Sequence, residues 1–237
     1  MTQQQLRDYL DRFMASLDQP NKEFLEARLK GLASVFPFNE YEYILMFLRD
    51  RSVITFDEYE ELRSNYVSSN KYLELYGLAP RIFGQIWGEE HLRELDARFR
   101  KADRTLDPDY AGQYDLWIEG VRVEVKAARA IDTKKRGNLV SKALRSDSDR
   151  PFWMNFQQLK LGICDVFIFI GVWVDQIVYW LLSNFQVKEN PYLSHQHRGG
   201  VEYQIGITDK NIHAFGGFRV SADEVADTVI QIGRGQV

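Results

Sequence analysis

Cysteine is almost absent from this 237-residue chain, which contains only Cys164. One cysteine cannot form an internal disulfide, so the disulfide-stapled secreted class is excluded and a reducing, cytoplasmic compartment is favoured. Long apolar runs are also missing, because the longest, Val166 to Val174, is less than half of the roughly 20 residues that a membrane-spanning helix needs. The polar first residues, MTQQQLRDYLDRF, do not resemble a signal peptide. We therefore expect no membrane partner.

A net basic charge is missing too, since 30 Lys and Arg face 34 Asp and Glu, a net charge of −4. Proteins that bind nucleic acids usually carry a basic surface for the phosphates, so the total argues against such a partner. The distribution argues otherwise, because residues 126–160 hold 9 basic and 3 acidic residues. These basic residues are Lys126, Arg129, Lys134, Lys135, Arg136, Lys142, Arg145, Arg150 and Lys160. On charge alone, this basic segment is equally consistent with a solvated loop.

The remaining composition is that of a folded protein, with 45% hydrophobic residues, 5 Trp, 12 Tyr and 15 Phe. The length suits one domain, or one domain with a small appendage. Residues 1–75 have a helical pattern, with Asn21 and Asn39 as candidate caps and a capping box at Thr55-Phe-Asp-Glu58. We divide the chain into this helical region, which serves packing, dimerisation or DNA contact, and a second domain at 76–237.

The second domain alternates between helical and extended patterns. A helix is expected from Pro80, because proline is favoured at the first helical position. The pattern then predicts strands at 114–118 and 121–126, a short helix at 151–161, buried strands at 164–174 and 177–182, further strands at 201–207 and 212–218, and a helix near 221–230. The predicted fold class is therefore α/β (α+β), with a mixed central sheet flanked by helices.

The first two predicted strands form a hairpin around a two-residue turn, Glu119-Gly120. This turn aligns Ile118 with Val121 and Leu116 with Val123, so Asp115 lies opposite Glu124. Side chains that face each other across an antiparallel pair have Cβ atoms roughly 4.5–5.5 Å apart. Two carboxylates at that separation repel each other unless a cation or a proton lies between them.

Lys126 projects from the same face of the strand as Glu124. Two carboxylates suit Mg²⁺, with Mn²⁺ as a substitute, since Mg²⁺ is often held by one or two carboxylates and a substrate phosphate. Such an ion activates water and neutralises charge on a phosphate, while a neighbouring lysine orients the nucleophile. The alternative is an ordinary surface hairpin, in which Glu124 and Lys126 are solvated and Asp115 pairs with Arg122 or Arg129.

These residues resemble the motif of the PD-(D/E)xK nuclease superfamily, in its restriction-endonuclease-like branch. Asp115 in QYDLWIEG matches the first acid, and Glu124 and Lys126 in VRVEVKAAR match the acid-x-Lys pair. The resemblance implies Asp115 and Glu124 as Mg²⁺ ligands and Lys126 in contact with the attacking water. It covers roughly residues 78–182, and Tyr114 stands where the family often has proline.

The resemblance also implies two further site residues. Members often add an acid from the helix before the hairpin, a position that Glu90, or less readily Glu89, fills here. Some branches use a glutamine on the helix after the acid-x-Lys strand, for which Gln157 is the candidate.

The function implied is a Mg²⁺-dependent DNA endonuclease, most simply a sequence-specific type II restriction enzyme. A palindromic target in double-stranded DNA would imply a homodimer. The candidate DNA contacts are Lys134, Lys135, Arg136, Lys142, Arg145, Arg150 and Arg198. Two alternatives stay open: a repair or defence nuclease of the same superfamily, and a non-catalytic DNA-binding or interaction protein that retains the fold.

His195 and His197 invite a metal interpretation, but no third ligand nearby completes a zinc site. We expect them in a loop beside Arg198. Cys164 lies in a predicted buried strand, where a small core residue is expected rather than a nucleophile.

Overall fold

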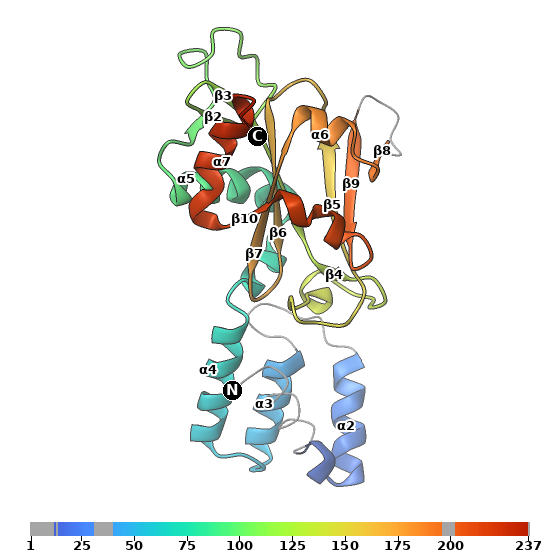
Figure 1. The fold of residues 1–237 in the computed structure, drawn as a ribbon. Coiled ribbons are helices and arrows are strands. Elements are labelled where there is room, and N and C mark those ends of the chain that lie inside the picture. Colours follow the sequence, from blue (N-terminus) through green and yellow to red (C-terminus); the bar gives the residue numbers. More distant parts are fainter. Residues whose placement is uncertain (1–11, 13, 31–39, 196–201, 237) are drawn as a thin grey trace. The chain divides into compact units, whose positions relative to one another are not determined.

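The computed structural model describes residues 12, 14–30, 40–195 and 202–236, and its elements are labelled in Figure 1. The chain forms two compact units. The first unit contains Met1–Gly77, Asp132–Ser148 and Trp173–Gln176, and the second contains Leu78–Ile131, Asp149–Val172 and Ile177–Val237. The division at residue 75 did not anticipate that two later segments belong with the N-terminal helices. None of the described helices is long and apolar enough to cross a bilayer.

The first unit is mainly helical. Its elements are α2 (Gln19–Lys30), α3 (Glu40–Asp50), α4 (Phe56–Ser69) and the 3-10 helices η1 (Leu73–Gly77) and η3 (Val140–Lys142). The predicted capping box is confirmed, because Thr55 and Glu58 exchange side-chain and backbone hydrogen bonds at the start of α4. The predicted cap at Asn21 is wrong: α2 begins two residues earlier, and Asp18 accepts a hydrogen bond from the Asn21 N–H at 2.9 Å. Asn39 lies outside the described residues.

Hydrogen bonds attach the two later segments to this helical unit. The backbone N–H of Tyr72 donates to Val174, and the N–H of Val174 donates to Leu144. The guanidinium of Arg145 donates to the carbonyl of Ser69 at the end of α4. The residues that follow α4 therefore hold both segments in place.

The second unit is built on a six-stranded mixed sheet in the order β1-β2-β3-β6-β7-β10. Its strands are β1 (Arg100–Lys101), β2 (Leu116–Ile118), β3 (Val121–Arg129), β6 (Val166–Val172), β7 (Ile177–Ser183) and β10 (Arg219–Val220). β3 and β6 are parallel and the other neighbours are antiparallel. Every residue of β6 is buried, as its continuous apolar sequence predicted.

Helices cover one face of this sheet. They are η2 (Ile82–Trp87), a π-helical turn that leads directly into α5 (Gly88–Leu95), and α7 (Val225–Gly233) after the short η5 (Ala222–Glu224). α5 lies against β3, where a Cβ added to Gly88 would be 3.4 Å from Val125 Cγ1. α7 packs on β3, β6 and β7. The helical segment begins at Pro80, as predicted.

A second, four-stranded sheet has the order β4-β5-β9-β8, and all of it except Asp132 belongs to the second unit. Its strands are β4 (Ile131–Asp132), β5 (Phe152–Leu159), β9 (Tyr203–Thr208) and β8 (Leu193–His195). Phe156 of β5 packs on Phe169 and Trp180, at ring-centroid distances of 4.9 and 6.4 Å. β5 therefore covers the face of the main sheet that the helices leave open.

Two predicted elements are wrong. The segment predicted as a short helix at 151–161 contains strand β5 (Phe152–Leu159), in which Met154 and Phe156 are buried while the intervening Asn155 is only partly covered, the alternation of a strand. Residues 212–218 form the 3-10 helix η4 (Ile212–Phe218) rather than a strand. The short helix α6 (Asn184–Lys188) was not predicted. The mixed α/β class is nevertheless confirmed.

Candidate metal and catalytic site

The β2–β3 hairpin has the predicted register: Leu116 pairs with Val123 and Ile118 with Val121. Its two turn residues, Glu119 and Gly120, have φ angles of 46° and 90°, which are typical of a type I′ turn. This turn matches the twist of the strands and fixes their alignment. The next positions along the hairpin are those of Asp115 and Glu124, as the sequence predicted.

Asp115 lies one residue before β2 and forms hydrogen bonds to β3 with both its backbone and its side chain. Its N–H donates to the carbonyl of Val123 at 3.0 Å. Its Oδ2 accepts a hydrogen bond from the N–H of Val125 at 2.8 Å. The carboxylate is therefore held beside β3 and next to Glu124.

Glu124 and Lys126 form a largely buried ion pair. The distance from Lys126 Nζ to Glu124 Oε1 is 2.6 Å, and the two side chains are 18% and 8% exposed. The alternative of a solvated surface hairpin is therefore wrong for these two residues.

The alternative partners of Asp115 are also engaged elsewhere. The Arg122 guanidinium binds Asp165 at 2.7 Å. The Arg129 guanidinium donates to the carbonyl of Leu78 and lies over the ring of Phe83. Neither arginine neutralises Asp115 as the surface-hairpin interpretation required.

Burial raises the pKa of the Glu124 carboxyl to about 7; Lys126 opposes the shift, and the charge of Asp115 adds to it. Burial also raises the pKa of Asp115, against the Val125 N–H and the charge of Lys126. One lysine therefore does not compensate for two desolvated carboxylates that lie side by side. A cation between them would relieve both effects.

The helix acid that approaches this pair is Glu89, not Glu90. Burial, followed by the charge of Asp115, raises the pKa of Glu89 to about 7. Glu90 is 57% exposed and pairs with Arg93 at 3.8 Å. Ile86, which lies one helical turn before Glu90, is itself 50% exposed, so this side of the helix does not face the sheet.

Gly88 marks the face of α5 that lies against β3. A Cβ at this position would be 3.4 Å from Val125 Cγ1 and 3.6 Å from Ala127 Cβ, which are ordinary van der Waals distances. The packing therefore does not require glycine here, and the sequence held no signal that separates Glu89 from Glu90.

Gln157 is exposed on β5, and in the described structure no contact joins it to the carboxylates. Its predicted place on a helix after β3 is wrong, because that segment is a strand. Its proposed catalytic role has no support from its position.

Two other residues near the carboxylates were not predicted as site residues. Burial and then the charges of Asp115, Glu89 and Glu124 raise the pKa of Tyr110, which lies in the loop before the hairpin. Lys160, which follows β5, acts on Glu124 in the opposite sense and lowers its pKa. No sequence pattern pointed to Tyr110, whereas Lys160 was part of the basic segment.

The donor set fits a hydrated divalent cation. No group of three or more His, Cys, Asp or Glu side chains with metal-binding geometry occurs within residues 12, 14–30, 40–195 and 202–236. Asp115 and Glu124 offer two hard carboxylates, and Mg²⁺ commonly binds one or two of these while it keeps several waters. Their raised pKa values indicate a place where positive charge is needed. These two residues would hold the ion.

The predicted DNA contacts are divided between the two units. Lys134, Lys135, Arg136, Lys142 and Arg145 belong to the first unit, whereas the carboxylates belong to the second. Arg150 is an exposed residue of the second unit. Arg198 lies outside the described residues.

Arg145 is bound within its own unit. Its side chain is only 16% exposed and pairs with Asp147 at 3.1 Å and with Asp175 at 3.8 Å. With its bond to the Ser69 carbonyl, these contacts make it a structural residue of the first unit.

Of the remaining candidates, His195 ends strand β8 rather than lying in a loop as expected, and Cys164 is buried as expected. The ring of His195 packs on Tyr203 at a centroid distance of 4.5 Å, and His197 lies outside the described residues. Cys164 is buried, and burial raises the pKa of its thiol, which disfavours a nucleophilic thiolate.

Comparison of the chain with models of known protein families gives no match, and a search of curated protein sequences gives none either.

Proposed function

We propose that this chain is a Mg²⁺-dependent endonuclease that hydrolyses phosphodiester bonds in double-stranded DNA, with a restriction-endonuclease-like core of the PD-(D/E)xK type. The observation that carries the proposal is the geometry of Asp115, Glu124 and Lys126, in which two desolvated carboxylates and one ammonium meet on a hairpin. Glu89, brought to the same place by α5, supports it. A sequence-specific type II restriction enzyme is the simplest form of this activity.

Each residue has a separate role in the proposed hydrolysis. Asp115 and Glu124 bind the divalent ion, and the Val125 N–H fixes the orientation of Asp115. The ion, when bound, neutralises charge on the phosphate and lowers the pKa of a water. Lys126, which pairs with Glu124 in the described structure, orients the water that attacks phosphorus. The raised pKa of Glu89 suits it to exchange a proton near neutral pH.

Supercoiled plasmid incubated with Mg²⁺ and the full chain tests this proposal. We expect cleavage that EDTA stops and that falls at least about 100-fold in Lys126→Ala, because the orienting ammonium is lost. Discrete fragments would indicate a restriction enzyme, and a homodimer in solution would agree with a palindromic target. Random cleavage or selectivity for branched DNA would indicate a repair or defence nuclease.

Neighbouring acids on α5 provide a matched control. Glu89→Gln should reduce the cleavage rate, because it removes a carboxyl beside Asp115, while Glu90→Gln should leave the rate within about twofold. Undiminished cleavage by Lys126→Ala would contradict the proposal. DNA binding that needs no divalent metal and survives Asp115→Asn, without cleavage, would indicate a non-catalytic DNA-binding protein.

A further inference from the structure

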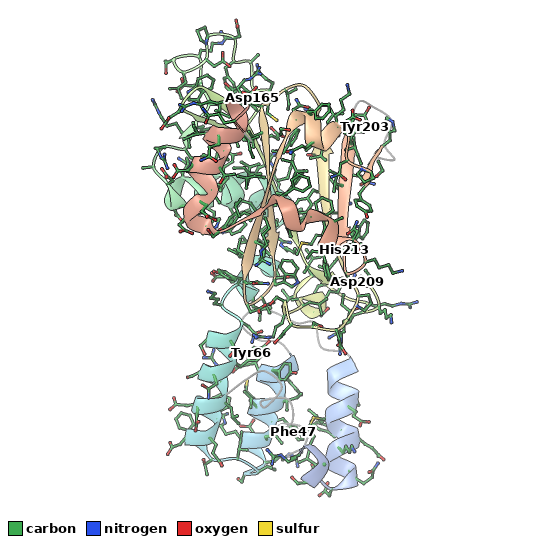
Figure 2. The ribbon with its side chains drawn as sticks, viewed as in Figure 1. Phe47, Tyr66, Asp165, Tyr203, Asp209 and His213 are labelled. Carbon is green, nitrogen blue, oxygen red and sulfur yellow. The ribbon has the colours of Figure 1, made fainter. Side chains whose placement is uncertain are left out.

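Lys160 is held close to the carboxylate site by a turn with two fixed ends. The turn begins after β5, where Leu159 pairs with Tyr203 of β9. It ends at Asp165, whose N–H donates to the carbonyl of Arg122 and whose carboxylate accepts bonds from the Arg122 N–H and guanidinium. Asp165 lies at the end of the sheet where β6 begins (Figure 2). The turn therefore adjoins the strand that carries Glu124.

A β-bulge determines which way Lys160 faces. In β5 the buried residues are Met154, Phe156 and then Leu159, so the interval increases from two residues to three. The pairing with β9 shifts at the same place, and Gln158 has a φ of 57°, which is rare for a residue other than glycine. Without the extra residue, Lys160 would take the buried phase of the strand. The bulge instead leaves Lys160 exposed.

The turn places Lys160 at the end of the sheet that carries Glu124, because Asp165 is bonded to Arg122 and the β6 residue Phe167 pairs with Glu124. The positive charge of Lys160 adds to that of Lys126 near this carboxylate. Lys126 is in direct contact with Glu124 at 2.6 Å, whereas Lys160 makes no ion pair within the described part of the chain. Bulges and residues in sparsely populated backbone conformations are concentrated near functional sites.

We propose that Lys160 binds a phosphate of the DNA strand that enters the site of Asp115 and Glu124. The proposal rests on the proposed function, since it takes DNA as the substrate. A lysine ammonium on a flexible stem acts as a point charge for phosphate. The bulge at Gln158 positions it, and the turn from Lys160 to Asp165 keeps it beside the acids.

Salt dependence of DNA binding tests this role without requiring cleavage. Binding of the full chain to a fluorescent DNA duplex is measured over a range of NaCl concentrations, with Ca²⁺ at a fixed concentration. The slope of log affinity against log salt should fall by about 0.9 in Lys160→Ala, because each neutralised phosphate contributes about that much. The affinity loss should be largest at low salt. Lys160→Arg should keep the wild-type slope.

Lys210→Ala is the matched control, because Lys210 is an exposed lysine beyond the other end of β9. It should bind DNA with wild-type slope and affinity. A wild-type slope and affinity in Lys160→Ala would overturn the Lys160 proposal alone if the wild type cleaves DNA. A reduced slope in Lys160→Ala without any cleavage by the wild type would overturn the nuclease proposal alone. Failure of the wild type to bind DNA at low salt would overturn both.

Discussion

At the scale of single residues, Glu124 links the candidate site to the stability of the protein. Its pKa rises from 4.5 to about 7 on folding, mainly through burial. The folded state therefore binds more protons than the unfolded state between these two pH values. Under that condition the free energy of unfolding decreases as the pH rises.

Without divalent metal, we expect the wild type to lose stability as the pH rises from about 4.5 to about 7, by up to roughly 3 kcal/mol. Glu124→Gln removes one of the titrating groups and should reduce this dependence, while Glu89, whose pKa is also raised to about 7, retains part of it. Urea unfolding at several pH values measures the effect, and Mg²⁺ should restore stability most at the upper end of the range. A wild type that becomes more stable over this range would contradict the expected shift.

The pair of acids and Lys126 were predictable because they depend on local geometry. A two-residue turn and the period of two in a strand fix which side chains meet across a hairpin. The choice between Glu89 and Glu90 was not predictable in this way, because it depends on which face of the helix the sheet covers. Gly88 shows that face only when its contact with Val125 is known.

At the scale of elements, β5 shows why a strand can have the sequence pattern of a helix. Its bulge separates the buried Phe156 and Leu159 by three residues, an interval that also fits one turn of a helix. The bulged strand therefore misled the sequence prediction, whereas β6, with all seven residues buried, did not.

Gln158→Gly tests whether the bulge stores backbone strain. Glycine adopts positive φ at little cost, so the substitution should leave stability unchanged or raise it by up to about 1 kcal/mol. Denaturant unfolding measures this, with Gln157→Gly as the control that should be neutral or destabilising. A clear loss of stability in Gln158→Gly would show that the side chain, not the backbone conformation, determines the bulge.

At the scale of the whole molecule, the basic segment is divided between two units. The sequence analysis predicted several of its residues as DNA contacts, but Arg145 is bound by Ser69, Asp147 and Asp175 within the first unit. Charge counted along a chain does not reveal which cations are already paired.

Arg145→Ala should destabilise the first unit by about 1–3 kcal/mol, because it removes the hydrogen bond to the Ser69 carbonyl and the charge that pairs with the largely buried Asp175. Hydrogen exchange should become faster in α4, while amides of β6 in the second unit keep their protection. Weaker DNA binding with unchanged exchange in α4 would instead return Arg145 to the predicted set of DNA contacts.

The chain passes between the two units five times, at Gly77, Ile131, Ser148, Val172 and Gln176. Domains generally fold as they emerge during synthesis, the N-terminal one first. Here the first unit is incomplete until Gln176 has left the ribosome, so its helices must wait for about a hundred later residues, including most strands of the other unit. The second unit is completed later still, because it also needs Ile177–Val237, so neither unit can finish folding before most of the chain has been made. Exchanging the first unit for another would require transplanting three separate stretches of the gene.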